Sequence, residues 1–240
     1  MIYTISSKQN EKIKDILKLA KPSERNARKQ FIVEGYHLLE MALENKCVLS
    51  IFTIKEIKGI DKSIPQYLIS EDILSKISST KSPQGVVSIC SMKKEAPIKG
   101  DKVLYLDNIS DPGNLGTIFR SALAFGYKDI ILDNTVSMYN EKVISSSRGA
   151  IFKLNIINGD ISLLKTLKEY QIIATEIKGS VSLEKVKANP KHILVLGNEA
   201  HGIKQEILNI SSLRVRIPIQ DIESLNVAIA GALCMYTLNK

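Results

Sequence analysis

The segment LDNISDPGNLGTIFRSALAFG, residues 106–126, decides the expected fold of this chain. An apolar, strand-like run ends at Leu106, a polar turn containing Pro112 follows, and a helical pattern begins near Asn114. Strand-like runs alternate with helical patterns through the second half of the chain, at residues 103–106, 129–132, 172–175, 193–196 and 215–217. This alternation predicts an α/β fold with a mostly parallel sheet that helices cover on both faces.

Two further segments also place a polar loop after a strand. ILVLGNEAHGI, residues 193–203, carries Gly197 and Gly202, which would let the backbone approach a ligand closely. RIPIQDIESLNVAIAGALCMY, residues 216–236, ends in an apolar helical pattern. Because loops after parallel strands gather at one edge of the sheet, the three segments are expected to form one ligand site there.

Plain structural roles explain part of these segments. Asn114 would cap a helix that carries Arg120 on its surface, and Glu199 would favour a helix N-terminus. Ser224 would be a good N-cap for the last helix. Asn226 is harder to explain, because a buried amide in the first turn of an apolar helix needs a hydrogen-bond partner.

The charge of the chain suggests an anionic partner. The 240 residues have a formal net charge of +8. Residues 1–100 hold 17 basic against 11 acidic residues, and residues 101–240 hold 16 against 14. The excess is densest from Lys8 to Lys29, where eight basic residues face three acidic ones. Such a cluster is either a solvated helix face or a surface that binds nucleic acid.

The first half predicts a small α/β unit. A basic amphipathic helix from Lys8 to Ala20 ends at Pro22, and a polar loop, SERNARKQ, follows. The charged segment at residues 92–101 is the expected linker. We therefore expect two domains, over residues 1–93 and residues 100–240. The expected phosphate contacts of the first domain are Lys12, Lys14, Arg25, Arg28 and Lys29.

Several protein classes are disfavoured by the sequence. Cys47, Cys90 and Cys234 are far apart and lie in apolar surroundings, so they are expected to be buried free thiols. The three histidines lack ligand spacing, and no metal site is expected. No apolar run approaches the roughly 20 residues of a membrane helix. The N-terminus lacks the apolar stretch of a secretory signal, so a cytoplasmic location is expected.

Together, the three segments resemble the three motifs of the SpoU-type branch of the SPOUT superfamily of RNA methyltransferases. SSSRGAIFKL, residues 145–154, is similar to the stretch between motifs one and two. ISSKQNEKIK, RKQFIVEGYHLL and KSPQGVV in the first half look like the substrate-binding domain that commonly precedes this catalytic domain. The resemblance covers nearly the whole chain. It implies a C-terminal domain with a deep trefoil knot, a homodimer with active sites near its interface, and S-adenosylmethionine as cofactor.

The resemblance also assigns residue roles. The matching catalytic positions are Asn114, Arg120, Glu199, Ser224 and Asn226. The positions expected around the cofactor, largely through backbone contacts, are Leu196, Gly197, Ile217, Ser224 and Leu225. Two departures stand out. The third motif, IPIQDIESLN, lacks a glycine that the family often has and is one residue shorter, and Arg148 replaces an apolar residue, which suggests a further RNA contact.

The implied function is S-adenosylmethionine-dependent methylation of a ribose 2′-hydroxyl in RNA. Ribosomal RNA is favoured over transfer RNA, because the simplest transfer-RNA members usually lack the N-terminal domain. One alternative is a non-catalytic RNA-binding or ribosome-assembly protein on the same scaffold; a transfer-RNA 2′-O-methyltransferase is another. A doubly wound nucleotide-binding enzyme is disfavoured, since neither G-x-G-x-x-G after a strand nor G-x-x-x-x-G-K-[ST] occurs.

Overall fold

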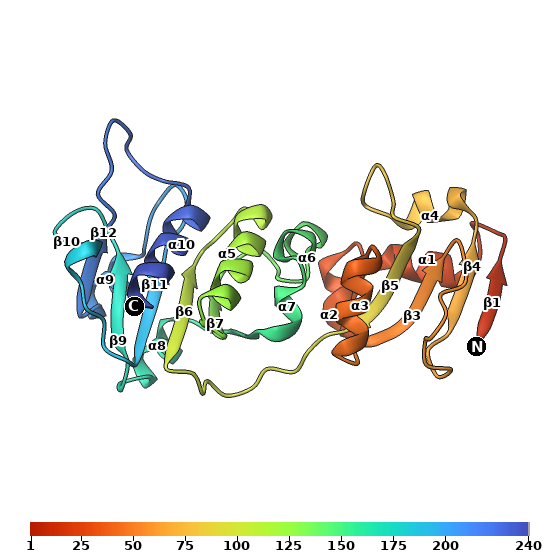
Figure 1. The fold of residues 1–240 in the computed structure, drawn as a ribbon, viewed down its shortest axis with the longest axis horizontal. Coiled ribbons are helices and arrows are strands. Elements are labelled where there is room, and N and C mark those ends of the chain that lie inside the picture. The colour runs from red at the N-terminus through yellow and green to blue at the C-terminus, as the bar shows by residue number, and fades with distance from the viewer. Residues whose placement is uncertain (240) are drawn as a thin grey trace. The chain divides into compact units, whose positions relative to one another are not determined.

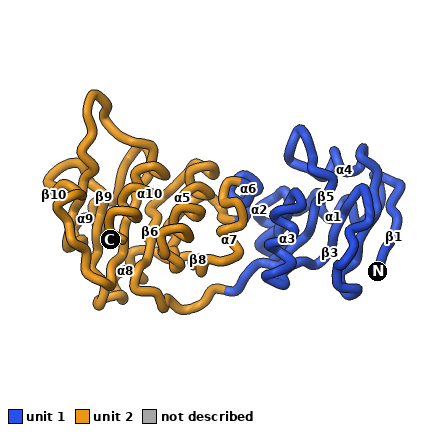
Figure 2. The backbone as a smooth tube through the Cα atoms, viewed as in Figure 1, with its two compact units in different colours: residues 1–94, 139–145 blue, residues 95–138, 146–240 orange. Residues whose placement is uncertain are grey.

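The computed structural model describes residues 1–239 and divides into two compact units, traced in Figure 1 and coloured separately in Figure 2. Unit 1 comprises Met1–Lys94 with Tyr139–Ser145, and unit 2 comprises Glu95–Met138 with Ser146–Lys240. Residues 139–145 were expected in the second domain. They pack in unit 1 because the ring of Tyr139 lies 4.7 Å from that of Phe31 and the Tyr139 hydroxyl accepts a hydrogen bond from the Lys93 amide.

Unit 1 contains a five-stranded mixed sheet in the order β1-β4-β3-β5-β2. Its apolar core joins this sheet to helices α1 and α4. The elements are β1 (Ile2–Ile5), α1 (Glu11–Lys18), α2 (Pro22–Arg28), β2 (Gln30–Glu34), α3 (Tyr36–Glu44), β3 (Val48–Thr53), β4 (Gln66–Ile69), α4 (Glu71–Ile77) and β5 (Val86–Ser91). The expected loop SERNARKQ is instead mostly helix α2, because Pro22 occupies its first turn rather than only ending α1.

Unit 2 contains a seven-stranded sheet in the order β10-β12-β9-β11-β6-β7-β8, and every pairing in it is parallel. The predicted α/β class with a mostly parallel sheet is therefore confirmed. The strands are β6 (Lys102–Asp107), β7 (Asp129–Asp133), β8 (Asn155–Asn158), β9 (Gln171–Thr175), β10 (Val181–Ser182), β11 (His192–Leu196) and β12 (Leu213–Arg216). The sequence analysis missed β8 and β10, which are short strands at the two sheet edges.

Helices cover both faces of this sheet. Val103 and Tyr105 of β6 pack in a core cluster with residues of α8 and α9, while Gly231 of α10 lies against Leu196 on the opposite face. Alternation along each strand separates the two sets of side chains. The helices of unit 2 are α5 (Pro112–Ala124), α7 (Ala150–Lys153), α8 (Ile161–Thr166), the 3₁₀ turn η1 (Leu183–Lys185), α9 (Gln205–Ile210) and α10 (Val227–Leu238). Helix α6 (Glu141–Ser147) belongs mostly to unit 1. The implied trefoil knot stays a prediction.

Candidate functional site

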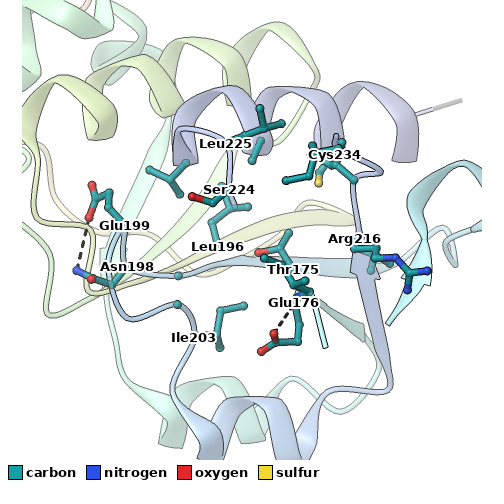
Figure 3. A pocket seen from close by; sticks show the side chains of 18 of the residues that line it. Thr175, Glu176, Leu196, Asn198, Glu199, Ile203, Arg216, Ser224, Leu225 and Cys234 are labelled. Carbon is teal, nitrogen blue, oxygen red and sulfur yellow. Dashed lines mark hydrogen bonds between the residues drawn. The ribbon is translucent and has the colours of Figure 1, made fainter. Parts of the chain in front are cut away.

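The three motif loops meet at the carboxyl edge of the unit 2 sheet, as the sequence predicts. Strands β9, β11 and β6 are neighbours, and the loops after β11 and β12 line one cavity together with the end of β9. The cavity has a volume of about 390 Å³. Figure 3 shows Thr175, Leu196, Ser224 and Leu225 around it. All five positions expected around a cofactor line it, namely Leu196, Gly197, Ile217, Ser224 and Leu225.

The wall of this cavity offers main-chain hydrogen-bonding groups. Residues 217–226 follow β12 without regular structure. Within residues 1–239, the backbone amides and carbonyls of Ile217 and Leu225 make no hydrogen bonds. Asp221, in the shortened motif, adopts a left-handed conformation with φ of 59°. This loop therefore turns without the expected glycine and keeps polar backbone groups available to a ligand.

A second cavity, of about 410 Å³, adjoins the first and collects polar side chains. Glu199, Ser224, Leu225 and Val227 line both cavities. Asn114 and Asn226 line only the second. Four of the five expected catalytic residues are thus brought together next to the expected cofactor cavity.

Three of these side chains form a continuous hydrogen-bonded row, which we call the amide relay: Glu199, Asn114 and Asn226. The Asn114 amide donates to Glu199 Oε1 over 2.9 Å, and the Asn226 amide donates to Asn114 Oδ1 over 2.9 Å. Each of the three residues comes from a different motif. The amide relay therefore fixes the three loops to one another, and each asparagine retains one uncommitted N–H.

Glu199 is held as a carboxylate. Burial raises its pKa, but hydrogen bonds from Asn114 and from the amides of Ser110 and Asp111 lower it more, so the net pKa lies below the ordinary value. The Ser110 hydroxyl also donates to it over 3.1 Å. An anion so well supplied with donors is a weak proton acceptor. Its geometry suits positioning of the Asn114 amide.

The helix caps differ from the expected ones. Asn226, not Ser224, is the N-cap of α10, and its Oδ1 accepts hydrogen bonds from the amides of Ala228 and Ile229. Asp111, not Asn114, is the N-cap of α5, because its side chain accepts a hydrogen bond from the backbone N–H of Asn114. Neither cap uses the Oδ1 of Asn114 or the side-chain NH₂ of Asn226, so these two groups can pair with each other. One Asn226 side chain explains both the cap and the relay, because its carbonyl and amide ends have different partners.

The local geometry of the motif-two loop explains its two glycines. A Cβ on Gly197 would lie 2.4 Å from the carbonyl carbon of Gly202, so the close crossing of the loop on itself excludes a side chain. Asn198 and Gly202 close this loop with backbone hydrogen bonds of 2.9 and 3.0 Å. Gly202 has a φ of 69° and open space around it. Helix α9 begins three residues later, at Gln205.

Arg120 lines neither cavity. It is exposed on α5, and no hydrogen bond or ion pair to another residue of 1–239 engages its guanidinium. Six helical positions separate it from Asn114, which places the two side chains on different sides of α5. Arg148 is also exposed, with a φ of 49°. The pairing of Asn114 with Arg120 is thus not formed within one copy of the chain.

One expected RNA contact is wrong. Arg25 is buried, with 4% of its surface exposed, and its guanidinium donates to the carbonyls of Leu19 and Ala20 at the end of the first helical segment. This side chain satisfies carbonyls that a helix end leaves unpaired, so it is not available to a phosphate. Burial lowers the pKa of Arg25, and the charge of Glu141 opposes that shift.

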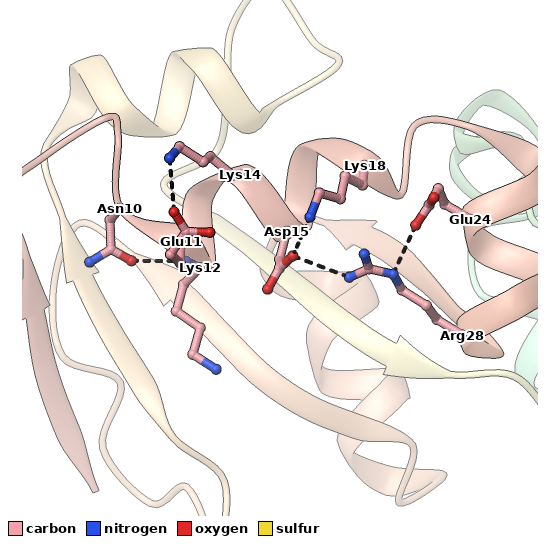
Figure 4. A network of polar contacts seen from close by, with 8 residues as sticks. All are labelled: Asn10, Glu11, Lys12, Lys14, Asp15, Lys18, Glu24 and Arg28. Atoms are coloured by element: carbon pink, nitrogen blue, oxygen red, sulfur yellow. Dashed lines mark hydrogen bonds and ion pairs between the residues drawn. The ribbon is translucent and has the colours of Figure 1, made fainter.

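The remaining expected RNA contacts are at the surface of unit 1. Lys12, Lys14 and Lys29 are exposed, and Arg28 is half-buried. Figure 4 shows Arg28 paired with Glu24 at 3.0 Å and with Asp15 at 3.4 Å. Carboxylates thus neutralise part of the positive charge of the residues from Lys8 to Lys29.

The sequence analysis missed a buried ionic cluster beneath the motif-two loop. The Lys204 ammonium lies 3.0 Å from Asp107 Oδ1 and 2.7 Å from Asp133 Oδ2, and Tyr105 donates to Asp133 over 2.8 Å. Asp107 and Asp133 end adjacent strands and pair in register. Burial lowers the pKa of Lys204, but hydrogen bonds to both carboxylates raise it more. The repeated Leu-Asp-Asn at residues 106–108 and 132–134 was the available signal.

Replacing Lys204 by methionine should destabilise unit 2. Two carboxylates with side-chain exposures of 1% and 11% would lose their cation. Because Lys204 itself is 40% exposed, solvent screens the cluster, and we expect the lower end of the usual range, a loss of about 3 kcal/mol. Hydrogen exchange at the amides of β6 and β7 measures it. Lys178→Met, at an exposed loop lysine, is the control, and equal exchange in both variants would contradict the prediction.

Other expectations concern metals, thiols and membranes. Within residues 1–239, no group of His, Cys, Asp and Glu side chains has the arrangement of a metal site. The three cysteines are free thiols; Cys90 and Cys234 are buried and Cys47 is half-buried. No helix in this described part of the chain combines the length and apolar character needed to cross a bilayer.

The sequence matches the SpoU rRNA Methylase family over residues 101–236. That is more than half of the chain. The chain belongs to the SpoU rRNA methylase family. Residues 10–88 of this SpoU family member also match the MRM3-like substrate binding domain. The family match contains all three motif loops and the whole amide relay, and the second match contains Lys12, Lys14, Arg28 and Lys29 of unit 1.

Named relatives agree with this assignment. The chain is 32% identical to the 23S rRNA (guanosine(2553)-2′-O)-methyltransferase RlmP of Bacillus subtilis, over 98% of each protein. It superimposes with a TM-score of 0.90 on an AdoMet-bound rRNA methyltransferase from Sinorhizobium meliloti, at 26% identity over 99% of this chain and 97% of that one. A structure described as an RNA 2′-O ribose methyltransferase gives a TM-score of 0.83 at 26% identity, covering 98% and 97% of the two chains.

Proposed function

We propose that this chain transfers a methyl group from S-adenosylmethionine to a ribose 2′-hydroxyl of ribosomal RNA. The observation that carries the proposal is the junction of two cavities, one with uncommitted backbone groups and one with the amide relay, at the carboxyl edge of the sheet. The relative that matches over 98% of its length is named for this reaction on 23S rRNA. Ribosomal RNA as substrate places the reaction in the cytoplasm.

The first cavity fits S-adenosylmethionine. Its volume of about 390 Å³ lies in the range of small-molecule sites, about 300–1,000 Å³. Leu196, Ile217 and Leu225 supply apolar surface for an adenine, and the free main-chain groups of Ile217 and Leu225 supply hydrogen bonds to its edge. When bound, the cofactor supplies an electrophilic methyl group on a positively charged sulfonium.

The second cavity positions the nucleophile. A ribose hydroxyl is a poor nucleophile, so its alignment with the methyl group contributes much of the rate. Asn114 and Asn226 each have one N–H left to hold the ribose, and Glu199 fixes the Asn114 amide. Ser224, which lines both cavities, lies where the two substrates meet. Glu199 acts as a positioning residue, because its lowered pKa makes it a weak base.

The reaction is tested with tritiated S-adenosylmethionine and ribosomal RNA. We expect tritium in 23S RNA and a gap in the alkaline hydrolysis ladder at one nucleotide, because methylation blocks the 2′-oxygen that attacks the adjacent phosphate. Transfer into transfer RNA only would change the substrate class. Transfer with an unbroken ladder would place the methyl group on a base and would contradict ribose methylation.

Arg120 is proposed to bind a phosphate of the RNA near the target. Its exposed guanidinium, without a partner in residues 1–239, suits a bidentate contact, and a guanidinium is too basic to accept a proton readily. Arg120→Lys should therefore lower methyl transfer by roughly tenfold or more, mainly through a raised KM for RNA. Arg214→Lys, at an arginine of β12 that lines neither cavity, is the control. A near-normal rate for Arg120→Lys would remove the need for a planar, bidentate cation.

The other expected basic positions at the surface, Lys12, Lys14, Arg28, Lys29 and Arg148, are proposed to contact RNA phosphates. The match of residues 10–88 to a substrate binding domain supports this for unit 1. Phosphate contacts release counterions, so RNA affinity should fall steeply with salt.

The chain is proposed to be a homodimer. Helix α10 presents an apolar stripe of Ile229, Leu233 and Tyr236, which are 54%, 42% and 53% exposed and recur at helical spacing. A second copy of the chain would bury this stripe. Leu233→Glu should convert the dimer to a monomer in sedimentation velocity, whereas Leu49→Glu, at a leucine of equal exposure in unit 1, should not. A wild-type chain that sediments as a monomer at every concentration would contradict the proposal.

A further inference from the structure

A separate hollow of about 480 Å³ lies in unit 1, on the sheet face beside helix α1. Phe52 pairs with Tyr67 and Ser50 pairs with Ile89, and all four line the hollow. Opposite residues of paired strands share a face, so these side chains form one continuous floor. The register of β3 shifts between Val48 and Ser50, which is a β-bulge of the kind that re-aims side chains at functional sites.

The floor carries a row of stacked aromatic rings. Tyr67 lies 5.0 Å from Phe52 and 5.6 Å from Tyr3, with interplanar angles of 28° and 27°. Phe52 is buried, whereas Tyr67 is half-buried and Tyr3 is exposed. A ring fixed between two neighbours keeps its orientation when a ligand arrives. Because Tyr3 and Phe52 cover the two faces of its ring, Tyr67 presents a preorganised edge to the hollow, and a planar group can pack against this edge in a T-shaped arrangement.

Three of the polar groups around the Tyr67 ring lack a hydrogen-bond partner in the described part of the chain. The side chains of Gln30 and Ser50 and the hydroxyl of Tyr67 make no hydrogen bond to any of residues 1–239. A glutamine amide offers a donor and an acceptor side by side, which is the pattern of a nucleobase edge. The hollow thus combines the edge of an aromatic ring with hydrogen-bonding groups that are free to read a base.

A single unpaired cation stands at the rim. Lys14 pairs with Glu11, Lys18 pairs with Asp15, and Arg28 pairs with Glu24 and Asp15. Figure 4 shows the Lys12 side chain pointing away from these pairs. Among residues 1–239, no carboxylate is within ion-pair distance of its ammonium. The hydrogen bond from Lys18 is the main cause that lowers the pKa of Asp15, and Arg28 adds to it. This carboxylate therefore stays ionised, and its two cations neutralise its charge. Of the two basic residues that line the hollow, Lys12 is the one without a carboxylate partner among residues 1–239.

We propose that this hollow binds one unpaired nucleotide of the RNA substrate, with its base packed against the edge of the Tyr67 ring and read by Gln30 and Ser50, and with its phosphate at Lys12. Figure 4 shows the position of Lys12 on α1. The inference rests on the proposed function and deepens it. It states what unit 1 recognises, which is a single-stranded nucleotide of the RNA and not the shape of a duplex. Flipped-out bases of loops and bulges have this chemistry.

The test uses the full chain and a fluorescein-labelled, single-stranded RNA octanucleotide of mixed sequence, with the corresponding duplex as competitor. Tyr67→Leu should weaken binding of the single strand about tenfold, and Tyr67→Phe should bind nearly as the wild type, since it keeps the ring. Gln30→Glu, which preserves size and cannot disturb packing, should also weaken binding. Lys12→Ala should lower the slope of log affinity against log salt by about 0.7. Tyr36→Leu and Lys58→Ala, at exposed residues outside the hollow, are the matched controls.

The outcomes separate this inference from the proposed function. Normal binding by both Tyr67→Leu and Gln30→Glu, or a wild type that prefers the duplex, overturns the nucleotide site. Binding of S-adenosylmethionine, measured on the same samples, should be unchanged in all variants of unit 1, and an unchanged thermal unfolding curve shows that unit 1 of each variant is folded. A wild-type chain that does not bind S-adenosylmethionine would overturn the proposed function instead.

Discussion

Asn114→Asp should reduce methyl transfer by about 100- to 1,000-fold while leaving cofactor binding nearly intact. The substitution removes the N–H that donates to Glu199 over 2.9 Å and places a second carboxylate against the first. Like charges at this separation repel, so the amide relay opens and the ribose loses its positioning group. Because Asn114 does not line the first cavity, S-adenosylmethionine should still bind.

Single-turnover transfer and calorimetric titration with S-adenosylmethionine separate these two effects. Asn209→Asp, at an exposed asparagine of α9, is the matched control and should behave as the wild type. Asn114→Ala should also be slow, but without the added repulsion. An Asn114→Asp variant with near-normal kcat would show that the amide relay has no part in the reaction.

Gly197→Ala should abolish both cofactor binding and methyl transfer, with losses of about 100-fold or more. The new Cβ would meet three backbone atoms of Gly202 and Ile203 at 2.4–2.5 Å, and backbone cannot turn aside as a flexible side chain can. The loop would have to break the bridge between Asn198 and Gly202. Its displacement moves a wall of the first cavity and carries Glu199 with it.

Gly202→Ala, in the same loop, separates crowding from backbone strain. Gly202 has open space around it, so alanine there costs only the left-handed conformation, about 1 kcal/mol. We therefore expect a modest loss for Gly202→Ala and a severe one for Gly197→Ala, measured by the same titration. Equal losses in the two variants would indicate that the close loop crossing is unimportant for the cofactor.

Much of the fold could be predicted because its signals are local. Buried parallel strands are short continuous apolar runs, and β6, β7, β9, β11 and β12 all have this form. Helix α2 was missed because its polar sequence, PSERNAR, lacks an apolar stripe. Arg25 was wrongly predicted to contact RNA for the same reason. Without an apolar stripe, the sequence does not show which side chains of a helix face the core.

Part of the candidate site could be predicted from motif residues, but their connections could not. The sequence places Asn114, Glu199 and Asn226 on three loops of one edge. That Asn226 both caps α10 and donates to Asn114 depends on the distance between loops 112 residues apart, which no local pattern encodes. The ionic cluster of Lys204 depends likewise on the register of β6 against β7.

Calorimetric titration of the purified chain with S-adenosylmethionine tests the central claim most directly. The account predicts saturable binding that is lost in Leu225→Arg, which places a cation in the first cavity, and retained in Leu49→Arg, at an exposed leucine of unit 1. A folded wild-type chain that binds no S-adenosylmethionine would contradict the account and would favour a non-catalytic RNA-binding protein on the same scaffold.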